Sequence, residues 1–341
     1  MKAWQYSSTS GGLEKNLKIN PSIPLPKPTP NQHLVQIIAC ALNPVDYKLS
    51  ELPLIGRFLI SKPATPCADF SGVIVTAASG SSLKPGQLVF GVSGSSPLSG
   101  GAMREFNVAT PDAVAAIPDG VSPIDVAGVG VAGLTAYQSI VPRVKKGDRV
   151  FINGGSGGTG VFGIQFAKVV GCHVTTSCSA RNIELCKSLG ADEVLDYTKG
   201  SLVKQLREKG WKFDHVVDNV GADDELIWHC GDFLNPGAVY VKVAGELSLH
   251  GILKGIKRKM WTGALGGMKG KMEGFWPKPQ VEDLATIAGW IKDGKVKAVI
   301  DEKFKFEEAP KAFERLKTGR ARGKVIVDVA SEVWKQVWEE S

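Results

Sequence analysis

A cluster of glycines near the middle of the chain has the residue types and spacing needed to bind a phosphate group. Val150–Ile152 is an apolar run typical of a buried strand, and the five glycines beyond it lead into a helical pattern that ends at Gly171. Gly155, Gly157 and Gly160 form the pattern G-x-G-x-x-G between that strand and that helix. Such a turn lets the backbone approach a pyrophosphate, which the free N–H groups at the start of the helix then bind. A glycine-rich surface loop is the alternative, but the flanking elements favour dinucleotide binding by Ser156, Gly157, Gly158, Thr159 and Gly160.

The residues after the next predicted strand, His173–Cys178, indicate which dinucleotide is bound. An NAD site carries Asp or Glu about twenty residues beyond the glycines, where the carboxylate binds the ribose hydroxyls. The stretch 177–182 reads SCSARN, which has no carboxylate but has a cation and hydroxyl groups. A guanidinium can hold a ribose 2′-phosphate through paired charge-assisted hydrogen bonds. We therefore predict NADPH rather than NADH, bound by Ser179, Arg181 and Asn182; a solvated residue at a helix start is the alternative role for Arg181.

Composition indicates a globular protein with room for two domains. The chain has 341 residues, of which 43% are hydrophobic and 22% charged. No apolar run approaches the roughly eighteen residues of a membrane-spanning helix, and the N-terminus lacks an apolar secretory core. The six cysteines are scattered singly, without the spacing of a disulfide framework or a zinc site. We expect a cytoplasmic protein.

The positive net charge of +7 is spread along the chain. Its densest patch is the short segment 254–259, which reads KGIKRK. We interpret this patch as a solvated face; a nucleic-acid or membrane site is the alternative, but no motif typical of nucleic-acid binding accompanies it. No nucleic-acid partner is expected.

The N-terminal part of the chain is rich in predicted strands. Pro21–Pro30 reads as an extended linker, and Asn43–Asp46 as a turn. The pattern has no helical period until Ile124–Val141, a run of small residues that predicts one helix at the entry to a second domain. A small barrel-like domain is therefore expected, with strands at 33–42, 69–77, 87–92 and 103–108.

Strands and helices alternate beyond the glycine motif, which predicts a doubly wound parallel α/β sheet. Ligands bind such sheets at the carboxyl ends of the strands, where Tyr197, Asn219 and Val243 fall. The stretch 245–275 gives no clear pattern and is left unassigned. Helices at 281–291 and 307–317, with their strands, are expected to return to the first domain. The predicted helices of the alternating part are 182–189, 201–209 and 223–233, and its later strands are 193–197, 213–220 and 238–243. The predicted domains are 1–122, 123–277 and 278–341.

Several separate motifs resemble one family, and they span nearly the whole chain in the order typical of that family. They read NPVDYK (43–48), AGLTAYQ (132–138), SARNIELCKSLGADEVLDY (179–197) and GRARGKVIV (319–327), besides the glycine turn. The chain resembles the zinc-free quinone oxidoreductase branch of the medium-chain dehydrogenase/reductases, close to the enone reductases and the chloroplast-envelope quinone oxidoreductase homologues. The resemblance implies a GroES-like barrel built from both chain ends, with a Rossmann domain between them. It adds Asn43, Lys48, Thr135 and Arg320 to the expected cofactor-binding residues, with Lys48 at the nicotinamide end.

The chain departs from the zinc-containing members of that family. Those relatives carry a cysteine and then a Gly-His-Glu run in the barrel, where this chain reads NPVD (43–46) and PCADFSG (66–72). The four-cysteine lobe of a structural zinc is also missing. Without such ligands no metal-activated alcohol can form, so we expect no metal and no alcohol oxidation.

The chemistry left to NADPH without a metal is reduction of a double bond conjugated to a carbonyl group, because the cofactor itself carries the hydride. Negative charge then develops on the carbonyl oxygen, which needs a hydrogen-bond donor. Tyr47 is the candidate catalytic donor, with a packing role as its alternative, and Asp46 is interpreted as fixing the local turn. The expected substrate is a small enone, enal or quinone, and a homodimer is one possible assembly. Three functions remain open: an enone reductase, which includes an enoyl reductase acting in trans for a polyketide synthase; a quinone reductase; and a non-catalytic NADPH-binding protein with a structural or RNA-binding role.

Overall fold

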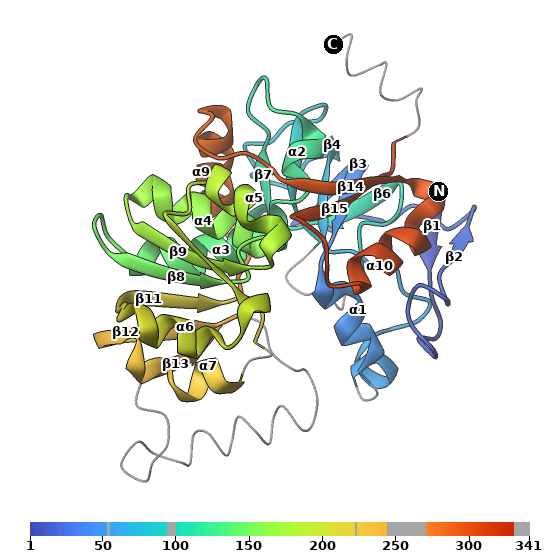
Figure 1. The fold of residues 1–341 in the computed structure, drawn as a ribbon. Coiled ribbons are helices and arrows are strands. Elements are labelled where there is room, and N and C mark those ends of the chain that lie inside the picture. The colour runs from blue at the N-terminus through green and yellow to red at the C-terminus, as the bar shows by residue number, and fades with distance from the viewer. Residues whose placement is uncertain (53–54, 94–99, 222–223, 244–270, 331–341) are drawn as a thin grey trace. The chain divides into compact units, whose positions relative to one another are not determined.

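The computed structural model describes residues 1–52, 55–93, 100–221, 224–243 and 271–330 (Figure 1). Backbone contacts divide the chain into two compact units. The first unit comprises Met1–Leu134 together with Lys278–Ser341, and the second unit is Thr135–Pro277. The basic segment 254–259 and most of the unassigned stretch 245–275 lie outside the described residues.

The first unit is built on a seven-stranded sheet whose strands come from both ends of the chain. Its order is β14-β15-β3-β4-β5-β7, with β6 also paired to β3. β14 and β15 run parallel and the other pairs are antiparallel. Val325 of β15 lies opposite Leu42 of β3, so the red and blue ends of the ribbon run side by side in Figure 1. The strands are β3 (His33–Leu42), β4 (Asp69–Thr76), β5 (Leu88–Val92), β6 (Phe106–Ala109), β7 (Val114–Ala116), β14 (Ile300–Lys305) and β15 (Lys324–Asp328), beside a two-stranded sheet of β1 (Ala3–Gln5) and β2 (Lys18–Asn20).

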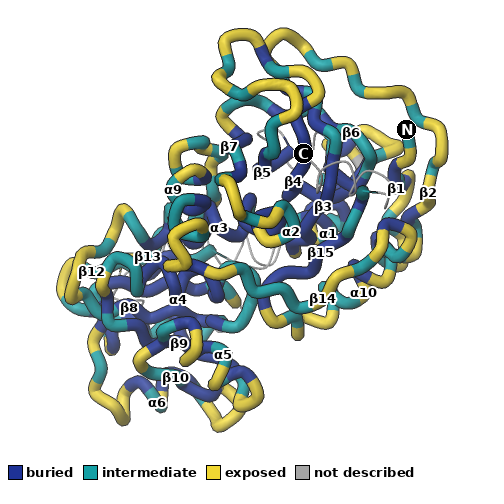
Figure 2. The backbone as a smooth tube through the Cα atoms, turned by 90° about the horizontal axis from the view of Figure 1, so that it is seen from above, coloured by how far each residue is buried: buried dark blue, intermediate teal, exposed yellow. Residues whose placement is uncertain are grey.

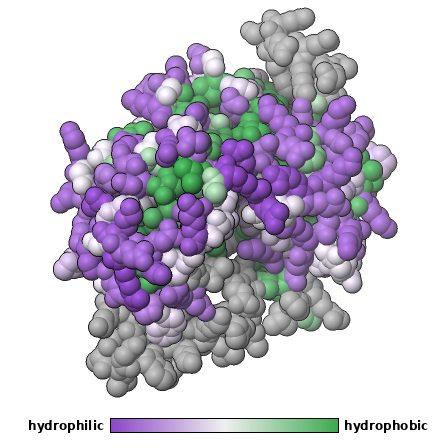
Figure 3. All heavy atoms as spheres, in the orientation of Figure 1, coloured by the Kyte–Doolittle hydropathy of each residue, from purple (hydrophilic) through white to green (hydrophobic). Residues whose placement is uncertain are grey.

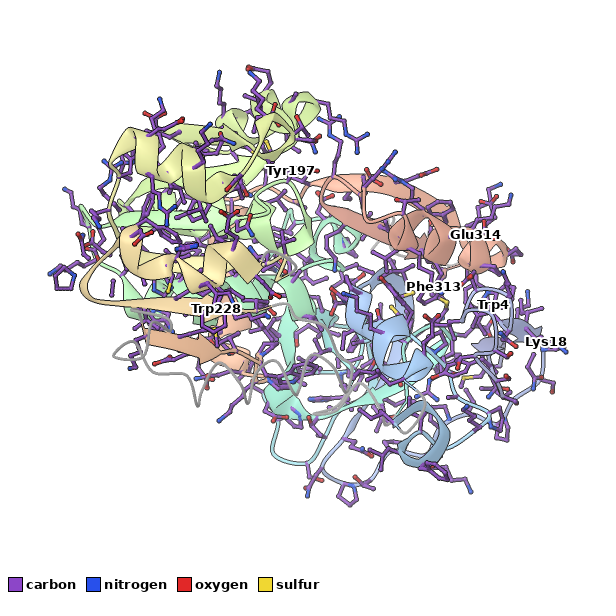
Figure 4. The ribbon with its side chains drawn as sticks, turned by 60° about the horizontal axis from the view of Figure 1, so that its bottom comes forward. Trp4, Lys18, Tyr197, Trp228, Phe313 and Glu314 are labelled. Carbon is purple, nitrogen blue, oxygen red and sulfur yellow. The ribbon has the colours of Figure 1, made fainter. Side chains whose placement is uncertain are left out.

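The core of the first unit lies where the apolar side chains of these strands meet α10 (Ala309–Lys317). Phe70, Phe90 and Phe313 are fully buried. Trp4 Nε1 donates a hydrogen bond of 2.7 Å to the Phe306 carbonyl, which ties the N-terminal strand to the last part of the chain. Figure 2 shows the buried strands in dark blue and their connecting loops in yellow, and Figure 4 labels Trp4 and Phe313.

The expectation of a barrel without helices is wrong. The predicted turn at Asn43–Asp46 is the start of helix α1 (Pro44–Glu51), which a π-helical turn, Ile55–Leu59, follows. Proline suits the first position of a helix because its missing N–H has no partner there anyway. The Asp46 carboxylate accepts a hydrogen bond of 2.8 Å from the Asn43 N–H, one half of a capping box. The helical signal was therefore present in the sequence.

The single helix predicted over Ile124–Val141 is also wrong, because α2 (Pro123–Val126) ends before α3 (Gly130–Ile140) begins. Two glycines in and after the break allow close packing within the first unit. A Cβ on Gly128 would lie 2.9 Å from Lys324 Cγ, and one on Gly130 would lie 2.6 Å from Asp69 Oδ1. The other helices in the described part of this unit are α9 (Val281–Lys292) and α10, with short 3-10 turns at Pro111–Ala113 and Phe306–Glu308.

The second unit confirms the predicted doubly wound fold. Its six strands are all parallel and lie in the order β10-β9-β8-β11-β12-β13. Counted within the unit this is 3-2-1-4-5-6, the order of a dinucleotide-binding sheet, in which ligands bind where the order reverses. That reversal lies between β8 and β11. The strands are β8 (Arg149–Asn153), β9 (His173–Cys178), β10 (Glu193–Asp196), β11 (Phe213–Asp218), β12 (Leu234–Lys242) and β13 (Lys271–Gly274), the last in the stretch that the sequence left unassigned.

Helices pack on this sheet through apolar faces. α4 (Gly158–Val170) lies against β8 and β9, and it ends at Gly171, whose φ of 93° suits glycine. α5 (Ile183–Ser188) lies against β9 and β10, and α6 (Leu202–Lys209) against β10. The helix predicted over 223–233 is shorter in the structure. It consists of α7 (Asp224–Trp228) and a 3-10 turn, Cys230–Asp232; further 3-10 turns are Val141–Arg143, Ala180–Asn182 and Tyr197–Lys199.

The surface of the described residues is mostly hydrophilic in the view of Figure 3, with hydrophobic side chains in small groups between the polar ones. Among these residues no helix has the length and apolar character needed to cross a membrane. All six cysteines are buried, and no disulfide joins them.

Candidate functional site

The three motif glycines of the second unit have different surroundings. A Cβ on Gly155 would lie 2.0 Å from Thr176 Oγ1, and one on Gly160 would lie 2.2 Å from the Gly154 carbonyl oxygen. Packing inside the protein therefore requires both glycines. A Cβ on Gly157 would meet only the Gly154 carbonyl oxygen, at 3.5 Å. Because the protein leaves space at Gly157, and α4 begins beside it without a side-chain cap, this turn suits the close approach of an anion.

A polar cluster joins the glycine turn to the end of β9. Asn182 Nδ2 donates hydrogen bonds to Ser156 Oγ at 3.0 Å and to Ser179 Oγ at 3.3 Å. Asn182 Oδ1 is buried and has no hydrogen-bond partner among the described residues. Arg181, next in the chain, is exposed. Four predicted cofactor ligands, Ser156, Ser179, Arg181 and Asn182, thus lie in contacting or adjacent positions. Ser177 belongs elsewhere, because its hydroxyl donates to Asn153 Oδ1 at 2.5 Å.

A buried network centred on Asp218 fixes the two loops at the point where the strand order reverses. Asp218 Oδ1 accepts hydrogen bonds from Asn153 Nδ2 at 2.7 Å and from the N–H groups of Val220 and Gly221 at 3.0 and 2.9 Å. Asp218 Oδ2 accepts a 2.7 Å hydrogen bond from the Tyr240 hydroxyl. Through Asn153 and Ser177 the network also reaches the Gly154 N–H, which donates to Ser177 Oγ at 3.0 Å. This network was not predicted from the sequence, where the available signal was a carboxylate at the end of a buried apolar strand.

The predicted residues at the strand ends lie where expected. Tyr197, Asn219 and Val243 each directly follow the last residue of a parallel strand. The Tyr197 side chain, labelled in Figure 4, is 54% exposed and so is open to a ligand. Asn219 Oδ1 is buried and has no partner among the described residues, which leaves one more free acceptor at this edge.

The predicted residues of the first unit differ in their accessibility. Lys48 and Arg320 are exposed, whereas Asn43 is buried, and its amide is used within the unit. Thr135, the first residue of the second unit, is also buried. The Tyr47 ring is half-buried against the core, and the Lys317 ammonium lies 5.1 Å from its centroid. Burial raises the pKa of the Tyr47 phenol, so the hydroxyl keeps its proton at neutral pH.

A buried charged cluster lies at the start of α1. The Lys324 ammonium donates to Asn43 Oδ1 at 2.6 Å, to the Leu42 carbonyl at 3.1 Å and to Asp69 Oδ2 at 3.2 Å. Asp69 is fully buried, and the Lys324 side chain is only 4% exposed. Asp46 accepts from the backbone N–H groups of Asn43 and Ala68 rather than from a side chain. Burial raises the pKa of Asp46 to about 7, a rise that these hydrogen bonds reduce and the Asp69 charge increases.

Comparison with known proteins places the chain in a family. Residues 29–119 match the alcohol dehydrogenase GroES-like domain, and residues 189–327 match the zinc-binding dehydrogenase domain. Trans-enoyl reductase pgmF of Aspergillus terreus is 46% identical over 350 aligned positions, which cover 98% of each chain. The chain belongs to the medium-chain dehydrogenase/reductases, in the branch of quinone oxidoreductases and enone reductases. It is an oxidoreductase, as its motifs predicted.

Other members of the medium-chain family agree with this placement. The chloroplast envelope quinone oxidoreductase homolog of Arabidopsis thaliana is 35% identical, over 96% of this chain and 98% of its own. The 2-methylene-furan-3-one reductase of Solanum lycopersicum is 32% identical, over 96% of this chain and 79% of its own. The solved quinone oxidoreductase of Coxiella burnetii superposes with a TM-score of 0.84 at 28% identity, covering 97% of this chain and 99% of its own. The predicted GroES-like and Rossmann architecture is thereby confirmed.

The zinc named in one of the matching family descriptions does not fit the residues of this member. The two barrel segments that carry the metal in zinc-containing relatives hold Asn43, Asp46, Cys67 and Asp69 here. Lys324 donates hydrogen bonds to Asn43 and Asp69. Asp46 accepts two backbone hydrogen bonds, and Cys67 Sγ lies 3.2 Å from the Ala41 carbonyl. Burial raises the pKa of the Cys67 thiol, which opposes the thiolate that zinc needs. In the part of the chain that the structure describes, no group of three or more His, Cys, Asp and Glu side chains is placed to hold a metal ion.

A nicotinamide cofactor does fit. The Rossmann domain of the medium-chain family binds such a cofactor, and here the open space at Gly157 lies at the glycine turn, where the Ser156 hydroxyl accepts a hydrogen bond from Asn182 and keeps its own hydrogen for donation. The residues that hold this turn in place, Asn153, Asp218 and Tyr240, are the ones that the sequence analysis overlooked.

Proposed function

We propose that this protein is an NADPH-dependent reductase of carbon–carbon double bonds conjugated to a carbonyl group. One observation carries the proposal: the glycine turn has space at Gly157 beside the hydroxyl groups that Asn182 holds, whereas Asn43 and Asp69, which stand in the metal-ligand segments of the barrel, are bound by Lys324. Hydrogen bonds, rather than a metal, must then polarise the substrate. Relatives named for reduction of enoyl and exocyclic-methylene ketone substrates support this choice.

The cofactor, when bound, supplies the hydride for the β-carbon of the substrate. The N–H groups of the glycine turn would bind the pyrophosphate. Arg181 would pair with the 2′-phosphate, and Asn182 holds the hydroxyls of Ser156 and Ser179 beside it. The other residues that we propose along the cofactor are Asn43, Lys48, Thr135, Gly157, Gly158, Thr159, Gly160, Tyr197, Asn219, Val243 and Arg320.

Tyr47 is the proposed donor to the carbonyl oxygen of the substrate. Its phenol is neutral at neutral pH, burial raises its pKa further, and a neutral hydroxyl can donate where negative charge develops. Lys48, one residue further along α1 and exposed, is the alternative donor.

The reaction is tested with deuterated NADPH and a panel of enones, enals and quinones. We expect the label on the β-carbon of the reduced enone, with the carbonyl group intact. Label on the carbonyl carbon would instead make the protein a ketone or aldehyde reductase. The names of the Arabidopsis and Coxiella relatives favour quinone reduction as the second candidate, and faster oxidation of NADPH by quinones than by enones would select it. Bound NADPH without turnover of any acceptor would indicate a non-catalytic binding protein.

The choice of NADPH over NADH is tested by Arg181→Ala. Only NADPH carries the phosphate, so its affinity should fall by roughly ten- to a hundredfold, the equivalent of a charge-assisted pair worth about 1.5–3 kcal/mol, while NADH binding changes little. Lys187→Ala is the matched control, because Lys187 is an exposed cation nearby in sequence that pairs with Glu184. An equal loss for both cofactors would contradict the phosphate assignment.

We also propose a cytoplasmic location and a small-molecule substrate. Six buried cysteines without a disulfide are typical of a protein from a reducing compartment. Light scattering on the purified protein will distinguish a monomer from a homodimer.

A further inference from the structure

Lys324 lies at a junction of the first unit. It comes from β15, yet its ammonium contacts the end of β3 through the Leu42 carbonyl, the residue before α1 through Asn43, and the start of β4 through Asp69. Lys324 is separated in the sequence from Leu42, Asn43 and Asp69 by 282, 281 and 255 positions. One cation therefore joins three segments that are far apart along the chain.

The partners of the cation hold one another as well. Asn43 Nδ2 donates to Asp69 Oδ2 at 2.8 Å, and Asp69 Oδ1 accepts from the Val131 N–H at 2.7 Å. Both carboxylate oxygens of Asp69 are thereby used, one of them at the first turn of α3. Because Asp69 and Lys324 are almost completely shielded from water, their attraction is weakly screened and the geometry is fixed closely.

We propose that the Lys324 ammonium is the cation bound by the barrel segments that carry the metal ligands in zinc-containing members of the family. It acts there as a positioning residue. By holding Asn43 it fixes the start of α1, the helix that carries Tyr47 and Lys48. The kinetic part of this inference rests on the proposed function, whereas the structural part does not.

The burial of Lys324 excludes direct contact between its ammonium and a substrate. Its side chain is 4% exposed, and its three hydrogen bonds saturate the ammonium donors. The effect on turnover must therefore pass through the placement of α1. A displacement of about 1 Å at a reacting group can reduce the rate by about a hundredfold.

The test uses a double variant, because removing Lys324 alone would leave a buried carboxylate without its partner. Lys324→Met with Asp69→Asn removes both charges and keeps similar volumes. Ser71→Ala is the matched control: Ser71 is fully buried on β4, two positions after Asp69, and its hydroxyl has no hydrogen-bond partner among the described residues. The measurements are hydrogen exchange of the peptide that spans α1, the Kd for 2′,5′-ADP, and kcat and KM for an enone accepted by the wild type.

We expect faster exchange across α1 in the double variant and a kcat reduced about ten- to a hundredfold. The Kd for 2′,5′-ADP should stay within about twofold of the wild-type value, since the polar cluster around Asn182 lies in the second unit and its hydrogen bonds are unchanged. The control Ser71→Ala should match the wild type in the exchange of α1, in the Kd for 2′,5′-ADP and in the kinetics with the enone. Unchanged exchange across α1, or an unchanged kcat in the folded double variant, would overturn the inference. If the wild type reduces no acceptor, the proposed function fails, and the exchange of α1 still decides the role of Lys324.

Discussion

The substitution Asp218→Asn tests whether the buried network of the second unit shapes the cofactor site. It keeps the volume of the side chain but removes the charge that four donors now face. Two of these donors are the backbone N–H groups of Val220 and Gly221, in the loop after β11. A third, Asn153, links the carboxylate to the glycine turn.

The magnitude follows from the type of hydrogen bond. A bond to a charged acceptor contributes about 1 kcal/mol more than a neutral one, so the two loop bonds together lose about 2 kcal/mol. If those 2 kcal/mol are the free energy that orders the loop, roughly the same amount is lost from binding, and the Kd for NADPH rises by roughly ten- to thirtyfold. Tyr240→Phe is the matched control, because the Tyr240 hydroxyl donates to Asp218 Oδ2, whereas the two loop N–H groups donate to Oδ1. It should lower the free energy of unfolding by about 1.5–3 kcal/mol and leave the Kd within about twofold.

Fluorescence titration with NADPH measures the Kd, and denaturant unfolding measures stability. A Kd that rises in Asp218→Asn but not in Tyr240→Phe, with comparable losses of stability, supports a role in ordering the loop. The reasoning is refuted if Asp218→Asn binds NADPH like the wild type, or if both variants lose affinity in proportion to their stability.

Three further predictions concern pH, catalysis and metal. Burial lowers the pKa of His215 to about 4, and its ring binds the Ser139 carbonyl at 2.6 Å. The neutral ring therefore contributes its full stability above the unfolded pKa of about 6.5, and this contribution is lost as the pH falls toward 4. Denaturant unfolding at pH 7.5 and at pH 4.5 should show that the free energy of unfolding of the wild type falls by about 2.5 kcal/mol, a loss that His215→Gln lacks. Parallel pH profiles of the two proteins would contradict this. Tyr47→Phe should reduce single-turnover rates by roughly one to three orders of magnitude without changing the Kd for NADPH, and an unchanged rate would leave the ring a packing role. Dialysis against a chelator should leave the activity intact, and stoichiometric zinc by elemental analysis would show that the barrel binds metal after all.

The main features of the second unit could be predicted from sequence because its signals are local. Alternating apolar segments, Gly171 after α4 and the glycine turn are each readable within about twenty residues. α1 was also encoded locally, but asparagine followed by proline is typical of turns as well as of helix starts, and the prediction chose the turn. The strand ends at Tyr197, Asn219 and Val243 followed correctly from the same periodicity.

Tertiary structure alone decided the polar interior. The break between α2 and α3 occurs where Gly128 and Gly130 pack against Lys324 and Asp69, which lie far from them in sequence. In the Asp218 network, the hydrogen-bonded pair Asn153 and Asp218 is 65 positions apart in the sequence. No local pattern records such contacts, because a buried charge is stabilised only by partners that the fold brings to it. The sequence thus determined the order of strands and helices in the second unit, whereas only folding brought Lys324 to Asn43 and Asp69.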